Sequence, residues 1–253
     1  MNQIQPDVSR ILVYLDLTED VEYDCLPLEL FSSLTVVLLG IYPVSDQATP
    51  EQTRDNFGDE AERIMDEVES RFFEQDVDTE RCIKFTSDPV ETLNSVALEQ
   101  ECDAILTPGE FESLERILVP VKGTEQFERM AGFIDDLLAK SPQNVTLVGF
   151  VEEKETTSDR RSYLEQFQNE LTSGEMREEM IEIRVDTVED VESMLIEEIE
   201  QYDLAVLGES EPELVDVVVG SVHENVINET TVPIITVIFP GEEGRQHQIR
   251  EDD

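Results

Sequence analysis

Arg10-Ile-Leu-Val-Tyr-Leu-Asp-Leu-Thr-Glu19 and Arg116-Ile-Leu-Val-Pro-Val-Lys-Gly-Thr-Glu125 are two versions of one segment, because six of their ten positions are identical. Later segments repeat in the same order along the chain. The further pairs are Leu34-Thr-Val-Val-Leu-Leu39 with Val145-Thr-Leu-Val-Gly-Phe150, and Cys102-Asp-Ala-Ile-Leu106 with Tyr202-Asp-Leu-Ala-Val206. The sequence therefore predicts an internal duplication with diverged loops.

The repeated segments are short, rich in β-branched residues and continuously apolar. This pattern is typical of strands that are covered on both faces in a parallel sheet. Between them the apolar spacing becomes helical. Three stripes show it: Ala61, Ile64, Met65, Val68 and Phe72; Phe127, Met130, Ala131, Ile134, Leu137 and Leu138; Val188, Val191, Leu195 and Ile199. Strands that alternate with amphipathic helices predict an α/β fold of two tandem doubly wound parallel-sheet units.

The two units are predicted to be unequal. After Gly208 the sequence continues into an expected helix at 221–229 and a fifth strand, Val232-Pro-Ile-Ile-Thr-Val-Ile-Phe239. The first unit passes from Gly109 directly into the next repeat, and Pro27 interrupts its first crossover. The expected domains are a truncated first unit, a complete second unit and a polar tail, at residues 1–112, 113–240 and 241–253.

The fifth strand has a predicted consequence for assembly. An apolar edge strand that is left open must be paired or covered. The first unit offers no equivalent strand, so the fifth strand must either pack on the first unit in another way or pair with a second chain. We expect the second, a homodimer that pairs through residues 232–239.

The composition is extremely acidic, with 61 Asp and Glu against 17 Lys and Arg and a formal net charge of −44. In molar salt the Debye length falls to about 3 Å, so closely spaced carboxylates become tolerable and keep a protein in solution. The charge therefore predicts the protein of a halophile. A disordered acidic chain is the alternative, and the plentiful, periodic apolar residues argue against it.

The same negative charge argues against nucleic acid and anionic lipid as partners, because both attract Lys and Arg. Residues 1–10 lack the basic-then-apolar order of a signal peptide. The longest apolar stretches, 34–44 and 232–239, are too short to span a bilayer. We expect a cytoplasmic protein with no direct membrane insertion.

Catalytic and metal-binding patterns are not found in the sequence. Cys25, Cys82 and Cys102 are odd in number and widely spaced, so they suggest neither a disulfide framework nor a zinc site. His223 and His247 have no nucleophile motif nearby. We expect no catalytic residues, no metal site and no enzymatic activity.

Two segments resemble the universal stress protein family: Asp203-Leu-Ala-Val-Leu-Gly208 and Gly220-Ser-Val-His-Glu-Asn-Val-Ile-Asn-Glu-Thr-Thr-Val-Pro-Ile-Ile-Thr-Val237. Ile117-Leu-Val-Pro-Val121 is similar to the family's opening strand, and Asp88-Pro89 to the entry of its third helix. With the duplication and the acidic composition, the likeness is to tandem, haloarchaeal members. It implies five-stranded parallel sheets flanked by helices. In the family's nucleotide-binding branch, ATP lies above the carboxyl ends of the strands, with a loop G-x2-G-x9-G-S/T around the phosphates.

A glycine loop of this kind binds phosphate because unobstructed backbone N–H groups can approach the anion. Gly208 matches the first glycine of the loop, and Gly220 with Ser221 matches the last pair. Glu211 stands at the second glycine, however, and the spacing to Gly220 is one residue short. Lys122 replaces the acid that the family has after its first strand. The second unit therefore keeps only part of the site.

The first unit keeps a different part. Asp16 and Thr18 match the family's first strand end, but Thr107-Pro-Gly109 leads into no phosphate loop. Neither unit carries a complete nucleotide site.

These departures favour a non-enzymatic stress or regulatory module that acts through protein contacts, with a transporter as one partner that the resemblance suggests. The alternative is a switch that binds ATP or another adenine nucleotide in the second unit. Its contacts would be Val121, Gly208, Gly220, Ser221 and Val222. A slow nucleotide hydrolase is a third hypothesis. A helix start with a serine cap explains Gly220 and Ser221 without any ligand.

Overall fold

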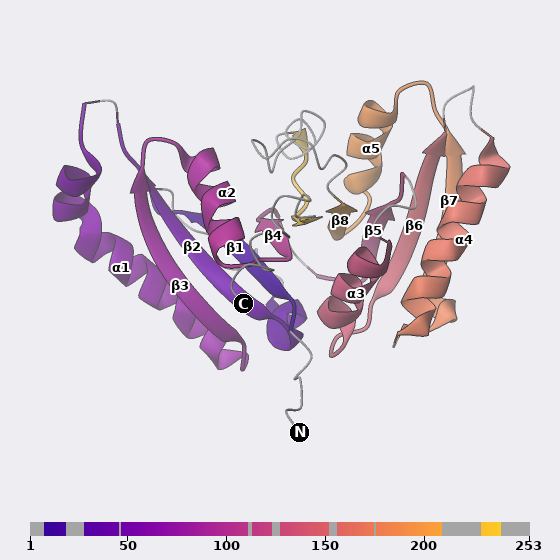
Figure 1. The fold of residues 1–253 in the computed structure, drawn as a ribbon, viewed down its shortest axis with the longest axis horizontal. Coiled ribbons are helices and arrows are strands. Elements are labelled where there is room, and N and C mark those ends of the chain that lie inside the picture. The colour runs from indigo at the N-terminus through magenta and orange to yellow at the C-terminus, as the bar shows by residue number, and fades with distance from the viewer. Residues whose placement is uncertain are drawn as a thin grey trace, which may run out of the picture.

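One nine-stranded β-sheet runs through the described part of the chain, in the order β3-β2-β1-β4-β9-β8-β5-β6-β7 (Figure 1). A computed structural model describes residues 8–18, 28–45, 47–110, 113–122, 127–151, 156–174, 176–208 and 229–238. Every neighbouring pair of strands is parallel except β4 and β9. The predicted α/β fold with a mainly parallel sheet is confirmed.

Strands β1 to β4, the first half, lie on the left in Figure 1. The elements are β1 (Arg10–Asp16), η2 (Leu28–Ser33), β2 (Thr35–Pro43), α1 (Pro50–Glu74), β3 (Asp78–Thr86), α2 (Pro89–Glu99) and β4 (Ala104–Thr107). Both long helices begin at a side-chain cap followed by proline. Thr49 and Gln52 form a capping box at α1, and Asp88 accepts from the Glu91 N–H at α2.

Strands β5 to β9, the second half, complete the sheet. The elements are β5 (Arg116–Pro120), α3 (Phe127–Leu138), β6 (Asn144–Val151), α4 (Thr157–Ser173), η3 (Glu178–Met180), β7 (Ile181–Thr187), α5 (Val191–Ile199), β8 (Leu204–Gly208) and β9 (Ile234–Val237). Asp190 caps α5 as Asp88 caps α2. The expected helix at 221–229 lies almost wholly outside the described residues, which resume at Glu229.

Strand β9 lies in the middle of the sheet. It pairs in parallel with β8, from Ala205 opposite Ile234 to Gly208 opposite Val237. On its other side it pairs antiparallel with β4, from Ala104 opposite Val237 to Thr107 opposite Ile234. The prediction that this strand is an open edge available to a second chain is therefore wrong. Both of its hydrogen-bonding edges are used within one chain, so a homodimer cannot pair through residues 234–237.

The strand order is symmetric about β9. β1 pairs with β2 and β4 as β5 pairs with β6 and β8, and β2 pairs with β3 as β6 pairs with β7. Because only the β4–β9 pair is antiparallel, the strands of the two halves run in opposite directions. The carboxyl ends of the first-half strands and those of the second-half strands therefore lie at opposite edges of the sheet.

The repeated sequence segments make the same hydrogen bonds in both halves. The Arg10 N–H donates to Asp103 Oδ2 over 2.9 Å, and the Arg116 N–H donates to Asp203 Oδ2 over 2.9 Å. In return, the N–H of each aspartate donates to the carbonyl of the same arginine, over 2.8 and 3.1 Å. The matched bonds agree with the repeat on which the predicted duplication rests, whereas the domain boundaries stay predictions.

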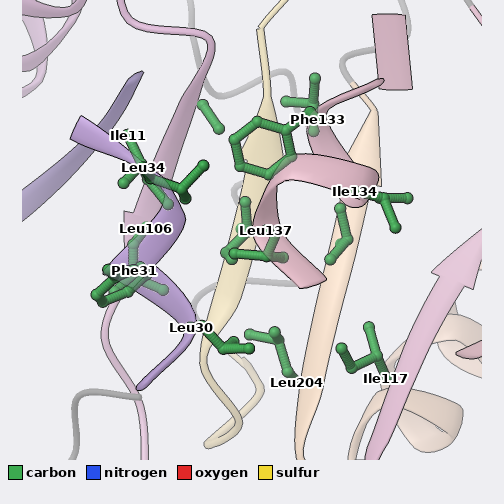
Figure 2. Close-up of a cluster of buried hydrophobic side chains, with 14 of the residues drawn as sticks. Ile11, Leu30, Phe31, Leu34, Leu106, Ile117, Phe133, Ile134, Leu137 and Leu204 are labelled. Carbon is green, nitrogen blue, oxygen red and sulfur yellow. The ribbon is translucent and has the colours of Figure 1, made fainter. Parts of the chain in front are cut away.

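The core differs between the two faces of the sheet. Ile11 and Val13 belong to one cluster of buried side chains and Leu12 to another, because alternate residues of a strand point to opposite faces. On one face a single cluster extends under η2, α1, α3 and α4 and joins the halves. Figure 2 shows Phe31 and Leu34 of the first half near Phe133 and Leu137 of the second. On the other face, α2 and α5 cover separate clusters.

Polar contacts also join the halves on the shared face. Ser9 donates from its N–H and its hydroxyl to Asp136 Oδ2, over 3.3 and 2.5 Å. Arg129 Nη2 donates to Asp103 Oδ1 over 3.0 Å. Lys140 Nζ donates to the carbonyl of Ser32.

The predicted helical stripes correspond to α1, α3 and α5, and their members are buried or partly buried. The first crossover, which proline was expected to interrupt, contains the 3-10 helix η2 in its described part. Strands β3 and β7 were not among the predicted strands. They are the outer strands of the sheet and carry exposed or half-buried charged residues, so they lack the continuous apolar pattern.

Candidate functional site

In a parallel α/β sheet, ligands bind beyond the carboxyl ends of the strands. In the second half, β5 and β8 are neighbours, so Val121 and Lys122 follow β5 at the same edge where Gly208 ends β8. Of the predicted nucleotide contacts, the structure thus places Val121 and Gly208 together. Gly220, Ser221 and Val222 lie outside the described residues, as do Glu209, Glu211 and Glu213.

Val121 belongs to the core. Its side chain is 6% exposed and lies in the large cluster, and its N–H donates to the carbonyl of Val148 over 2.8 Å. Its carbonyl oxygen is engaged as well, by Arg160 Nη1 at 3.4 Å. The same Nη1 donates to the carbonyl of Lys122. A guanidinium therefore occupies the end of β5.

Arg160 was not among the residues singled out from the sequence. It lies in the first turn of α4, where exposed charged residues are the rule, yet it is only 8% exposed. Gly149 on β6 explains this burial. A Cβ atom at Gly149 would come within 2.5 Å of Arg160 Cγ and 2.7 Å of Cδ, so only glycine leaves room for the arginine stem.

The first half fills the matching space with apolar groups. Gly40 lies five residues after the start of β2, as Gly149 lies five residues after the start of β6. A Cβ atom at Gly40 would come within 2.7 Å of Met65 Sδ and 2.9 Å of Leu17 Cδ1. The two glycines at matching positions of the repeat were the sequence signal that a side chain packs closely against each strand. They do not reveal that the side chain against Gly149 is an arginine.

At the carboxyl ends of the first-half strands, which we call the first-half edge, the chain makes contacts with itself. Asp16 Oδ1 accepts from the Thr18 N–H at 2.8 Å and from its hydroxyl at 2.6 Å, which forms a closed local turn. Gly109 lies against the backbone of residues 231–233, where an added Cβ would be 2.5 Å from Pro233 N and Thr231 O. Gly109 therefore permits a crossing of two backbones just before β9. It does not begin a phosphate loop.

Three stacked aromatic side chains lie near the carboxyl ends of β2 and β3. The rings of Phe57 and Phe85 stack on that of Tyr42, with centroids 4.9 and 5.6 Å away. Arg54 lies over Phe85, with its Cζ 5.3 Å from the ring centroid. Burial raises the pKa of the Tyr42 hydroxyl, and the negative charges of Glu60 and Asp16 raise it further. Tyr42 is therefore a neutral hydroxyl at neutral pH.

The reactive side chains that remain among the described residues include the buried Cys102. Burial raises the pKa of the Cys102 thiol to about 12, so this cysteine is not a thiolate nucleophile at neutral pH. Among the same residues, His, Cys, Asp and Glu side chains form no group of three that could hold a metal ion. Cys25, His223 and His247 lie outside the described residues.

A mainly parallel sheet with helices on both faces defines an α/β fold. Residues 113–237 match the model of the universal stress protein family. The similarity to this family covers about half of the chain.

Solved structures of low identity share the fold over nearly the whole chain. A universal stress protein from Archaeoglobus fulgidus is 13% identical, with a TM-score of 0.64, over 93% of this chain and 98% of that one. A putative universal stress protein from Pseudomonas aeruginosa is 11% identical, with a TM-score of 0.55, over 95% and 96%. No curated protein matches the sequence. In the described parts of the chain, no helix combines the length and the apolar character needed to cross a bilayer.

Proposed function

We propose that this protein is a non-enzymatic, cytoplasmic stress or regulatory module of a halophile, and that it acts through protein contacts. The observation that carries the proposal is the guanidinium of Arg160, which is buried at the end of β5 and bonded to the carbonyls of Val121 and Lys122. A ligand at this edge would have to displace a cation that the fold holds by packing on Gly149.

The first-half edge supports the same proposal. Asp16 and Thr18 satisfy each other, and Gly109 packs on the backbone that leads to β9. Asp16, Thr18, Gly109 and Arg160 thus all make contacts within the chain. A transporter is one partner that the family resemblance suggests, and a homodimer would need a surface other than β9.

A nucleotide-binding switch is the second candidate. One observation favours it: Lys122 and Arg160 place two cations at the end of β5, beside Gly208 on the neighbouring strand. Positive charge at this position would stabilise a phosphate group. Binding would then require Arg160 to exchange the two carbonyls for phosphate oxygens.

Calorimetry with ATP and magnesium in molar potassium chloride separates the two candidates. We expect no micromolar binding by the wild-type protein, and no nucleotide in native mass spectra of protein purified in high salt. Arg160→Ala tests the displaced-cation argument, with Arg161→Ala as the matched control, because Arg161 is exposed and pairs with Glu165 on the helix surface. Micromolar binding by the wild type that only Arg160→Ala abolishes would place the nucleotide switch first.

A further inference from the structure

A cavity of about 280 Å³, which we call the α2–β3 cavity, lies between α2 and the outer strand β3. Lys84 and Thr86 line it from the strand, because residues two apart point to the same face of a sheet. Glu91, Ser95 and Glu99 line it from the helix, where a spacing of four residues places them along one flank. The cavity therefore has an ammonium group on its strand side and two carboxylates on its helix side.

The opposite charges of this cavity are not paired with each other. Among the described residues, Lys84 forms no ion pair, although the other charged residues that line the cavity are acids. Burial raises the pKa of the neighbouring Cys82 thiol, nearby Lys84 lowers it, and nearby Glu99 raises it. Lys84 and Glu99 thus lie near the same thiol without contacting each other.

The threonine hydroxyls of the cavity wall are already bonded within the chain. The Thr92 hydroxyl lies 2.9 Å from the Thr86 hydroxyl and 2.8 Å from the Asp88 carbonyl. The Asp88 N–H donates to the Thr86 hydroxyl over 3.0 Å. These bonds hold the start of α2 against the end of β3, so the charged side chains and Ser95 are the groups that can meet a ligand.

The second half fills the matching space with its own side chains. Residues are matched by counting from the helix caps Asp88 and Asp190, and the resulting pairs are Cys82 with Arg184, Lys84 with Asp186, and Val96 with Glu198. Arg184 donates to Glu198 over 2.6 Å and to Asp186 over 2.7 Å, so its guanidinium connects β7 with α5. The first half has a thiol and a valine where this arginine and glutamate lie. These shorter side chains account for the cavity beside Lys84.

The size and the charges of the α2–β3 cavity define the kind of ligand. Sites for drug-sized molecules have volumes of about 300–1,000 Å³, so this cavity suits a metabolite with few non-hydrogen atoms. A simple anion would be repelled by Glu91 and Glu99, and a simple cation by Lys84. A molecule that carries both charges meets each group with its opposite. In molar salt the screening length is about 3 Å, so direct contacts of this kind keep their strength.

We propose that the α2–β3 cavity binds a small zwitterion that carries one carboxylate and one ammonium group. The ligand carboxylate would accept from Lys84 Nζ, and the ligand ammonium would donate to the carboxylates of Glu91 and Glu99. The Ser95 hydroxyl, which lies between the two glutamates along the helix, offers a further polar contact. This inference goes beyond the proposed function, because it involves neither protein contacts nor the end of β5.

The test uses the full chain in molar potassium chloride and γ-aminobutyrate as the probe, followed by ligand-observed NMR titration. Butyrate and butylammonium are the controls, since each carries only one of the two charges. We expect γ-aminobutyrate to bind saturably and about tenfold more tightly than either control, because only the zwitterion forms both charge-assisted contacts.

Lys84→Met and Glu99→Gln should each weaken binding of γ-aminobutyrate about tenfold, because each removes one charge and keeps most of the side chain. Arg63→Met and Glu101→Gln are the matched controls and should leave binding unchanged. Arg63 pairs with Glu67 on the exposed surface of α1, Glu101 is exposed, and neither lines the cavity. Ser95→Phe keeps every charge but fills the space, so it should abolish binding. Circular dichroism confirms that each variant is folded.

Four outcomes would overturn the proposal. The first is no saturable binding of γ-aminobutyrate to the wild type, and the second is equally tight binding of butyrate or butylammonium, which would make the cavity a simple ion site. The third is an equal loss of binding in the control variants. The fourth is binding that appears only after deletion of residues 240–253, which would make the chain's own tail the occupant.

Discussion

The carboxylate of Glu198 is buried on α5, with the residue 4% exposed, and Arg184 on β7 neutralises it. Arg184 Nη1 donates to Glu198 Oε1 over 2.6 Å, and Nη2 donates to Asp186 Oδ2 over 2.7 Å. These hydrogen bonds raise the pKa of Arg184. Breaking such a pair leaves an unpaired buried charge, which costs far more than the net contribution of the pair.

We therefore expect Arg184→Gln to lower the free energy of unfolding by about 3 kcal/mol, because Glu198 stays buried without a countercharge. Urea denaturation in high salt measures the loss. Arg177→Gln is the control, since the Arg177–Glu179 pair is 65% and 72% exposed and contributes about 0.5 kcal/mol at most. An equal loss of unfolding free energy in the two variants would contradict the expectation that buried Glu198 needs Arg184 as its countercharge.

Two glycines predict opposite responses to the same substitution. Gly109→Ala should destabilise the protein by about 2 kcal/mol, because the new Cβ meets backbone atoms at 2.5 Å that cannot move independently. Gly132→Ala should stabilise it by about 1 kcal/mol, because Gly132 lies within α3 and no atom lies within 4 Å of the added Cβ. Thermal unfolding of both variants measures the difference, and a neutral Gly109→Ala would contradict the close crossing near β9.

At the residue scale, the sequence predicted which strand ends lie at the candidate site. It did not predict that the guanidinium of Arg160 lies at the end of β5. Val121 follows one recognisable apolar strand and Gly208 ends another, and these two strands are neighbours in the sheet. Arg160 stands among polar residues at the start of a helix, where a solvated arginine is the ordinary expectation. Its burial depends on Gly149 of another element, and that is a tertiary relation.

At the scale of elements, β9 gives a direct test of its place in the sheet. Ile235 is fully buried in the shared core and lies between Leu106 of β4 and Val206 of β8. Ile235→Lys should therefore unfold the protein or lower its stability by more than 3 kcal/mol, because it buries an unpaired charge. If the variant instead stays fully stable and only changes its oligomeric state, measured by light scattering beside its melting temperature, then β9 is an exposed edge after all.

The apolar composition of β9 identified a strand, yet it could not identify the neighbours. A centrally placed strand and an interchain edge strand carry the same continuous apolar pattern, and both satisfy the need to cover it. The outer strands β3 and β7 were missed for the opposite reason, because they lack a continuous apolar pattern. Arg81 on β3 pairs with Glu62, Asp66 and Glu69 of α1, so charged residues that look like a loop in the sequence hold an edge strand against its helix.

At the scale of the whole molecule, the net charge of −44 predicts that the fold depends on salt. At low ionic strength the exposed carboxylates repel one another across the surface, and the few basic residues offset little of this repulsion. Circular dichroism during dilution from molar potassium chloride should show loss of helical signal. Dilution into an equal concentration of sucrose controls for osmotic effects, and a melting temperature that is the same at low and molar salt would refute the expectation.

The antiparallel pairing of β4 with β9 also predicts that the two halves of this chain can complement each other as separate fragments. A break in the backbone between Gly109 and Arg116 would leave the first fragment with β4 as a bare, apolar edge and the second with β9 as its only complement. Neither piece could hide its exposed strand alone, and each would recognise the other by the register that already joins them. When the two pieces are co-expressed from separate genes, they should reassemble as a heterodimer. The covalent link would then serve mainly to raise the effective concentration of one half near the other, and the structure of each half would not depend on it.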